Sequence, residues 1–277
     1  MLAILLAVVS LLLPVHAERL RFVVVGDTGG GSAAVAKGIA VVHAQSPLDA
    51  IVITGDNVYP CGVKSATDPK WSVVRPLSAL GIPLYPVLGN HDYCGDPDAQ
   101  VGAPLPNWNL PAREFTLRSK LADFAFIDTT PIARGTRAPT TLTFGDAPWR
   151  IVVGHHTVVS SGYHGYLPRD EHTRMRQLIA PMRNAKVDLY LCGHDHHLEL
   201  LRTNPLMLVS GAGSEPIVPV MRHGSTLFPD QTTSYRGFAV VELTSKQMTI
   251  GFYDADGKAR SKLFSFSRRE KVPRSGG

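Results

Sequence analysis

The sequence predicts an α/β fold, in which helices cover the faces of a parallel or mixed β-sheet. Short apolar runs alternate with segments of helical character in the amino-terminal part of the chain, which is the rhythm of strand–helix–strand units. These runs are apolar at successive positions, as in strands that are buried on both faces. The 277 residues are 44% hydrophobic and 18% charged, which is enough apolar material for one large or two small domains.

The amino-terminal third is predicted to contain three buried strands joined by two helices. The strands are expected at residues 21–25, 48–54 and 83–88. The helices are expected at residues 33–45 and 71–80. Residues 95–111 are rich in Pro, Gly, Asn and Asp and predict a long loop. A loop of that length in a compact domain is often part of a functional site.

The remainder of the chain predicts further strands around one more helix. The strands are expected at residues 113–119, 122–128, 150–153, 187–192, 198–201, 206–209, 238–243, 248–252 and 262–266. The helix is expected at residues 169–184. Residues 268–277 are basic and end in Pro and Gly, so we expect a flexible tail after a main domain over 18–267.

Residues 1–17 predict a secretory signal peptide. The stretch from Met1 to Val15 is almost wholly apolar, and Ala17 completes a small-x-small cleavage site. A retained membrane anchor is the alternative, although the run is short for a span and Pro14 lies near its end. We therefore expect a periplasmic or secreted protein that has no membrane contact after signal removal.

Charge and cysteine content exclude several classes of partner and site. The net charge of +5 is mild and the basic residues are scattered, so we expect no nucleic-acid partner. Three cysteines without a CxxC pair argue against a zinc ribbon. Cys61 and Cys94 each follow a polar cluster and could form a disulfide in an oxidising compartment, whereas Cys192 ends a predicted strand and is expected to be buried.

Five predicted strands end in a small residue followed by side chains that can bind metal ions. These side chains are Asp27; Asp56 with Tyr59; Asn90 with His91; His155; and His194 with His196. Sites in open α/β sheets form outside the carboxyl ends of the strands, so five such endings predict one shared crevice. The donors outnumber the four of an ordinary zinc site, and two metals that share a bridging carboxylate are the economical interpretation. Separate structural ions would not need the Asn and the additional His.

The ordered blocks GDTGG, GDNVYPCG, GNHDY, VVGHH and GHDHH resemble those of the calcineurin-like metallophosphoesterases. Tyr59 within GDNVY is the residue by which the chain resembles the purple acid phosphatase branch. Within that branch, the chain is most similar to the small, tartrate-resistant type. The similarity extends to GHHTVVSSGYHG, FAFID and LVSGAG and so covers most of the mature chain. With this resemblance we expect an α/β fold of four layers, an α/β/β/α sandwich of two mixed β-sheets flanked by helices, with the catalytic domain over 18–267.

The resemblance implies seven metal ligands and two histidines that face the substrate. The implied ligands are Asp27, Tyr59 and His196 for a ferric ion, Asn90, His155 and His194 for a divalent ion, and Asp56 as the bridge between them. The divalent ion could be Fe, Zn or Mn, because nitrogen and oxygen donors accept several ions. His91 would stay off the metals as general acid, and His164 would assist it or hold the phosphate.

The implied activity is acid hydrolysis of phosphate monoesters, with small phosphorylated substrates as partners. A phenolate suits Fe(III), and a trivalent ion lowers the pKa of bound water, so hydroxide would be available as nucleophile below neutral pH. His91 would then protonate the leaving alkoxide. A phosphodiesterase or nucleotidase with a Zn or Mn pair remains an alternative, although it needs no phenolate. A non-catalytic exported metal-binding protein remains the second alternative, although such a protein would not need a free acid such as His91. The oligomeric state is left open.

Four polar neighbours of the implied ligands receive weaker assignments. His156 and His197 are expected to point to the side opposite the ligands, where packing or surface roles are favoured. Asp195 is expected to make a hydrogen bond in a turn instead of binding metal. Asp92 could orient a histidine ring from behind.

Overall fold

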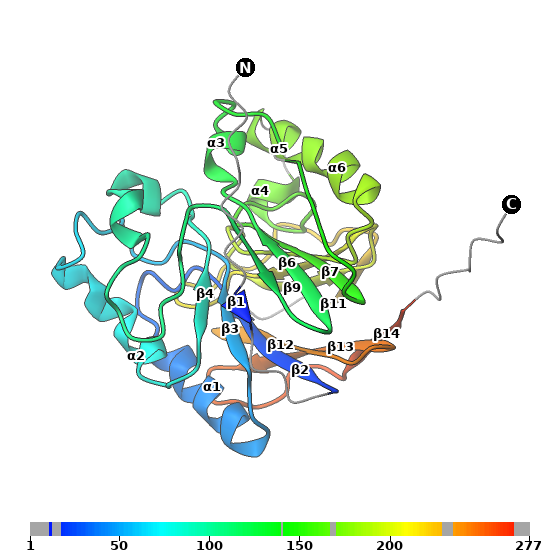
Figure 1. Cartoon of the computed structure of the whole chain (residues 1–277), viewed down its shortest axis with the longest axis horizontal. Coiled ribbons are helices and arrows are strands. Elements are labelled where there is room, and N and C mark those ends of the chain that lie inside the picture. Colours follow the sequence, from blue (N-terminus) through cyan, green and yellow to red (C-terminus); the bar gives the residue numbers. More distant parts are fainter. Residues whose placement is uncertain (1–10, 13–17, 140, 167–169, 229–234, 269–277) are drawn as a thin grey trace, which may run out of the picture.

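Two mixed β-sheets pack face to face, and helices cover the outer side of each (Figure 1). The computed structural model describes residues 11–12, 18–139, 141–166, 170–228 and 235–268. The six-stranded sheet runs β14 (Phe264–Ser267), β13 (Gln247–Asp254), β12 (Gly237–Leu243), β2 (Leu20–Val25), β3 (Ala50–Ile53) and β4 (Leu84–Pro86). The eight-stranded sheet runs β1 (Leu11–Leu12), β5 (Phe115–Arg118), β6 (Ala122–Phe126), β7 (Trp149–Val153), β8 (Leu189–Cys192), β10 (Leu206–Ser210), β9 (Leu198–Leu201) and β11 (Thr226–Phe228). The predicted four-layer α/β/β/α sandwich is confirmed.

The parallel part of each sheet determines where the polar strand ends meet. Strands β2, β3 and β4 are parallel neighbours in one sheet. Strands β6, β7, β8 and β10 are parallel neighbours in the other. The two sheets are joined where β2 and β10 end, because the Gly26 amide donates to the Ser210 carbonyl at 2.7 Å and the Ser210 hydroxyl donates to the Val24 carbonyl. The carboxyl ends of both parallel sets therefore meet at one edge of the sandwich.

Alternate residues of the strands fill the two sides of the eight-stranded sheet. Phe124 faces the other sheet and meets Phe22 edge-on, with ring centroids 5.4 Å apart. Ala125, the next residue, faces outward and packs under the helices together with Ile132 and Met175. A buried side chain of the size of Phe124, Ile132 or Met175 stabilises the fold by about 1.5–3 kcal/mol relative to an exposed one.

The helices lie in two outer layers (Figure 1). One layer contains α1 (Ala33–Gln45), which packs on β12 and β13, and α2 (Arg75–Ser78). The other contains α3 (Thr130–Ala133), α5 (Asp170–Met175) and α6 (Ile179–Asn184), with the short α4 (Tyr163–Tyr166) beside them. Short 3-10 helices occupy Pro69–Val73, Asp92–Cys94, Pro97–Gln100 and Arg176–Leu178.

Two predicted helices are broken into shorter pieces. The helix predicted at 71–80 is a 3-10 turn followed by α2, and the one predicted at 169–184 is α5, a 3-10 turn and α6. Pro76 and Pro181 explain the breaks, because proline has no amide hydrogen and its ring clashes with the carbonyl four residues earlier. Strand β11 and helices α3 and α4 are short elements that the apolar patterns did not predict.

The two chain ends are described only in part. Of the signal peptide predicted over 1–17, Leu11–Leu12 is described and pairs with β5, while residues 1–10 and 13–17 lie outside the described residues. Of the tail predicted over 268–277, only Arg268 is described. Within the described part of the chain, no helix is both long enough and apolar enough to cross a bilayer.

Candidate metal centre

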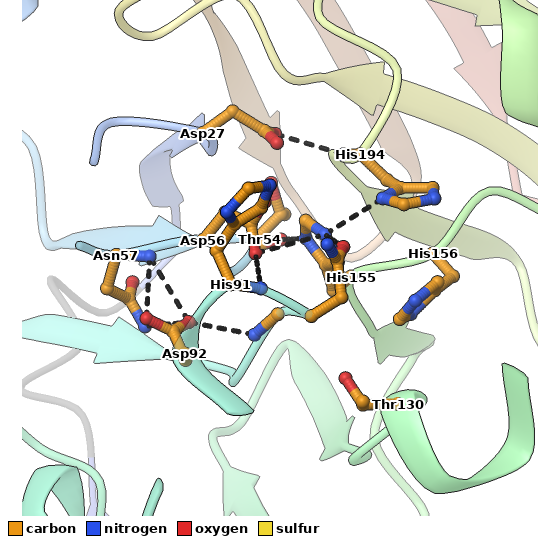
Figure 2. Close-up of polar contacts among 12 residues, drawn as sticks. Asp27, Thr54, Asp56, Asn57, His91, Asp92, Thr130, His155, His156 and His194 are labelled. Carbon is orange, nitrogen blue, oxygen red and sulfur yellow. Dashed lines mark hydrogen bonds and ion pairs between the residues drawn. The ribbon is translucent and has the colours of Figure 1, made fainter. Parts of the chain in front are cut away.

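All predicted metal donors lie just beyond the carboxyl ends of strands from both sheets. The segments that follow β2, β3 and β4 contribute Asp27, Asp56, Tyr59 and Asn90, and those that follow β7 and β8 contribute His155, His194 and His196. Figure 2 shows Asp27, Asp56, His155 and His194 directed toward one another from these separate segments. The structure thus brings together residues that are up to 169 positions apart in the sequence.

Three of these side chains form a first donor group. The Tyr59 hydroxyl oxygen lies 3.2 Å from Oδ1 of Asp27 and 3.1 Å from Nε2 of His196. The same His196 nitrogen is 3.4 Å from the Asp27 oxygen. The other ring nitrogen of His196, Nδ1, donates a hydrogen bond to the Glu215 carbonyl at 2.9 Å. The lone pair of Nε2 is therefore available to bind a metal ion.

A second donor group lies next to the first. Nε2 of His155 is 3.0 Å from the Asn90 side-chain oxygen and 3.1 Å from Nδ1 of His194. Asp56 connects the groups: its Oδ1 is 3.4 Å from Nε2 of His155, and Asp27, Asp56 and His155 each present an atom within 4.8 Å of the others. The seven donors predicted from sequence are therefore arranged as two triplets with a carboxylate between them.

The backbone at three of the donors is held in a left-handed conformation. Asp27, Asp56 and His194 have φ angles of 56°, 52° and 66°. Such residues cost about 1–3 kcal/mol each and tend to occur where the surrounding structure serves a site. The strain indicates that these side chains are held in directions that the fold would not otherwise favour.

The glycines before the donors serve mainly to let side chains approach closely. A Cβ on Gly193 would lie 2.2 Å from Oδ2 of Asp27, and one on Gly89 would lie 2.1 Å from Oδ1 of Asp56. Of the glycines that directly precede a donor, Gly55 has a left-handed φ, of 90°. At Gly89 and Gly193 the absence of a side chain therefore provides space for the carboxylates more than freedom to turn.

Burial and charge oppose each other in the first donor group. Burial by itself raises the pKa of Asp27, but the hydrogen bond and charge of His196 and the other histidines bring it below the ordinary value. Burial lowers the pKa of His196, and Asp27 outweighs this and raises it to about 9. Burial and then the carboxylates Asp27 and Asp56 raise the pKa of Tyr59 far above its ordinary value.

The donor set fits two metal ions. Two carboxylates buried against a phenol favour a cation between them, because a positive charge stabilises both the carboxylates and a phenolate. Hard oxygen donors combined with imidazole nitrogens suit iron, zinc and manganese. His155 and His194 also turn ring nitrogens toward each other at 3.1 Å, an arrangement in which a shared cation satisfies both lone pairs.

The two histidines expected to face the substrate lie at the rim. The His91 side chain is 41% exposed, and its Nδ1 donates to the Pro60 carbonyl at 2.7 Å, so Nε2 is the nitrogen directed at Asp56, 3.9 Å away. His164 on α4 is 30% exposed, and its ring centroid lies 3.9 Å from that of His194. Both imidazoles therefore combine contact with the donor groups and access to solvent.

Glu171 belongs to the site although no sequence pattern singled it out. Its Oε1 lies 2.9 Å from Nε2 of His194 and 3.4 Å from Nδ1 of His164. Burial raises the pKa of Glu171, but its contacts with the two histidines outweigh burial and leave the pKa well below the ordinary value. An acidic residue in the first turn of a helix is ordinary, so the sequence contained no sign of this role.

Two weaker predictions about neighbouring residues are wrong. Asp92 does not orient a histidine: it accepts hydrogen bonds from the Gly89 and Asn57 amides and the Gln100 side chain, and burial raises its pKa to about 6. His156 does not point away from the ligands. Its ring lies 4.5 Å from that of His194, with Nδ1 at 2.8 Å from the Thr129 hydroxyl.

His197 and Asp195 do turn away from the donors, as expected. Nε2 of His197 is 3.0 Å from the buried carboxylate of Glu199, and Asp195 accepts hydrogen bonds from backbone amides in the segment that carries His164. Burial raises the pKa of Glu199, but the bonds from His197 and from Ser161 outweigh it and lower the pKa overall.

A disulfide between Cys61 and Cys94 joins two segments of the site. The Cα atoms are 4.9 Å apart, and the cysteines follow Tyr59 and His91 closely in the chain. Cys192 is a buried free cysteine, as predicted. The cross-link therefore ties the loop of the first donor group to the loop of the rim histidine.

Comparison with known proteins agrees with this geometry. A family model described as calcineurin-like phosphoesterase matches residues 20–198. The chain is 31% identical to purple acid phosphatase 4 of Arabidopsis thaliana, over 88% of this chain and 82% of the relative. It is 30% identical to tartrate-resistant acid phosphatase type 5 of Homo sapiens, over 92% and 94%. The solved structure of GAP50, described as the anchor in the inner membrane complex of Plasmodium, shares the fold with a TM-score of 0.76 at 24% identity, over 92% and 90% of the chains.

The matched region includes the whole candidate centre. All seven donors and both rim histidines lie between residues 20 and 198. The two acid phosphatase relatives align over 82% and 94% of their lengths at 31% and 30% identity, so the match is not limited to the metal-binding blocks. The chain belongs to the purple acid phosphatases, metal-dependent phosphomonoester hydrolases of the calcineurin-like phosphoesterase family.

Proposed function

We propose that this protein is an acid phosphatase that hydrolyses small phosphate monoesters at an Fe(III)–M(II) centre. The observation that carries the proposal is the pair of donor triplets joined by Asp56, with two solvent-accessible histidines at their rim. Membership in the purple acid phosphatases supports the same reaction class.

Each donor group favours a different ion. Asp27, Tyr59 and His196 would hold Fe(III), because a phenolate and a carboxylate are hard anionic ligands. Asn90, His155 and His194 would hold a divalent ion, Fe, Zn or Mn, since this group is neutral apart from the shared Asp56. When bound, the ions would neutralise phosphate charge and lower the pKa of water to supply hydroxide at acidic pH.

His91 has the geometry of a proton donor to the leaving group. Its Nδ1–H is held by the Pro60 carbonyl, so the proton that it exchanges is on Nε2, the nitrogen that faces the centre. The ring packs edge-on against Tyr59, with centroids 4.6 Å apart, which limits its rotation. An imidazolium at this place would donate to the leaving oxygen as the ester bond breaks.

His164 would act on the same substrate from the other donor group. Glu171 lies beside it, with Oε1 3.4 Å from its Nδ1. A charged imidazole next to His194 would bind the phosphate or share proton donation with His91. The two rim histidines would thus surround the phosphate from the sides of both metals.

We also infer that the protein acts in the periplasm or outside the cell. The apolar segment at 1–17 and the Cys61–Cys94 disulfide support this placement, because disulfides persist in oxidising compartments.

A metal analysis, an absorption spectrum and a pH series on a chromogenic monoester test the proposal together. We expect a tyrosinate–iron absorption band that is lost in Tyr59→Phe and kept in Tyr85→Phe, a buried tyrosine of β4 outside the donor groups. We expect His91→Ala to keep its metals and lose about 10²–10⁴-fold in turnover of esters with poor leaving groups. Faster hydrolysis of a diester than of the matched monoester, or a colourless active protein, would contradict the proposal.

A further inference from the structure

The segment that binds the metals also holds the segment that carries His164. Along the stretch after β8, His194 and His196 turn toward the donor groups, whereas Asp195 between them turns the other way. The side chains diverge because the backbone bends through this stretch: His194 has a left-handed φ of 66°, and the amides of Asp195 and His197 donate to the carbonyls two residues earlier. Of these three successive residues, the two histidines therefore face the candidate metal centre, and Asp195 faces the chain segment behind it.

The carboxylate of Asp195 receives the backbone of that segment. The His164 amide donates to Oδ1 at 2.9 Å, and the Gly165 amide donates to Oδ2 at 3.1 Å. The residue is 3% exposed, and the Thr157 hydroxyl lies 3.5 Å from Oδ2. Both carboxylate oxygens of the buried Asp195 thus accept hydrogen bonds from one turn of backbone. Hydrogen bonds to a carboxylate are stronger than those between neutral groups.

Gly162 provides the space for this contact. A Cβ at Gly162 would lie 2.3 Å from Cγ of Asp195, which no side chain tolerates without displacement of the carboxylate. The turn over Tyr163–Tyr166 is too short to hold its own position, since a single helical turn is marginal without outside contacts. The position of His164 relative to His194 therefore depends on outside contacts, among them the two backbone hydrogen bonds to Asp195.

We propose that Asp195 is a positioning residue that fixes His164 against the metal-binding segment during phosphate ester hydrolysis. The proposal rests on the function proposed above. Glu171 contacts the ring of His164 but also contacts His194, so its loss would disturb the metal donors as well. Asp195 instead acts on the His164 backbone, and because it stands between His194 and His196, metal content is measured beside turnover.

The test compares Asp195→Asn, His164→Ala and the double variant in the metal-loaded enzyme. Asparagine has one acceptor oxygen where aspartate has two, and its NH₂ group would face a backbone N–H. At least one of the hydrogen bonds from the His164 and Gly165 amides is therefore lost. We expect Asp195→Asn to keep the metal content and absorption spectrum and to lose about tenfold or more in kcat on alkyl phosphates. The loss on activated aryl phosphates should be smaller, because a good leaving group needs less protonation. The double variant should be no slower than His164→Ala alone.

Two further variants keep the test decisive. Gly162→Ala displaces the carboxylate by a separate route and should reproduce the kcat loss if Asp195→Asn folds poorly. Asp188→Asn is the matched control. Asp188 directly precedes β8, at the end opposite the site, and its carboxylate accepts a hydrogen bond from the Arg150 amide at 2.8 Å. This substitution should leave kcat unchanged.

Two results would overturn the inference while the proposed function stands. In one, wild-type protein hydrolyses monoesters and both Asp195→Asn and Gly162→Ala keep full kcat. In the other, the double variant shows the product of the two separate losses, so that Asp195 acts independently of His164. A metal-loaded wild-type protein without monoesterase activity would instead overturn the proposed function. In that case amide hydrogen exchange at His164 and Gly165 still tests the positioning contact, since Asp195→Asn should speed exchange at both amides.

Discussion

Removal of the Cys61–Cys94 disulfide should lower the stability of the fold far more than the activity of the site. The cysteines are 33 positions apart, and for a closed loop of that length the chain-entropy relation gives about 4 kcal/mol of stabilisation at 25 °C. For a domain of this size, each kcal/mol corresponds to about 2–4 °C, so the melting temperature should fall by about 10 °C.

The local geometry around the disulfide explains why activity should persist at low temperature. The Gly62 amide still donates to the His91 carbonyl at 2.8 Å, and the Asp96 amide donates to the Val63 carbonyl at 2.8 Å. These bonds hold the same two segments in the folded state, whereas the disulfide acts mainly by restricting the unfolded chain.

Thermal and urea unfolding of a Cys61→Ser/Cys94→Ser variant, followed by circular dichroism, measures the effect. A reductant should bring the wild-type protein down to the stability of the variant and leave the variant unchanged. A difference below about 1 kcal/mol would refute the reasoning, as would a wild-type protein that is insensitive to reductant when unfolded.

Three further predictions concern the donor groups and the network behind them. His194→Ala should lower mainly the divalent metal content and His196→Ala mainly the iron content, as measured by elemental analysis; equal loss of both ions in each variant would contradict the division. Gly193→Ala places a Cβ 2.2 Å from the Asp27 carboxylate and should weaken iron binding by about tenfold or more in a metal titration, with the fold retained. The lowered pKa of Glu199 means that its stabilising contribution is present above its ordinary value of 4.5 and is lost as the pH falls further. Glu199→Gln should therefore lose less stability than wild type as the pH falls below 4.5, and an unchanged acid limb in urea unfolding would contradict this.

Much of the fold could be predicted because the strands are buried on both faces. Such runs are apolar at every position, so the pattern of residues 50–53 or 189–192 indicates a strand without knowledge of its neighbours. The helices were harder, because the breaks near Pro76 and Pro181 depend on single residues within an otherwise helical composition.

The predicted donors come together because each follows a strand end. Topology then brings the ends together, so the local sequence around Asp27 or His155 was sufficient to select the residue type. Asp92 and His156 show the limit of the same reasoning. Each lies beside a donor in the sequence, yet its partners are determined by loops that the sequence around it does not specify.

The sequence by itself determined the fold class, the choice of candidate donors and the assignment of the chain to a known family. Chemistry that depends on residue type and short spacing is visible in the chain, as the HDH stretch at 194–196 shows. Only the tertiary structure decided the roles of Glu171 and Asp195, which contact His164 across separations of 7 and 31 residues. A carboxylate on a short helix or in a turn is compatible with many partners, and its partner is selected by packing between segments that are distant in sequence.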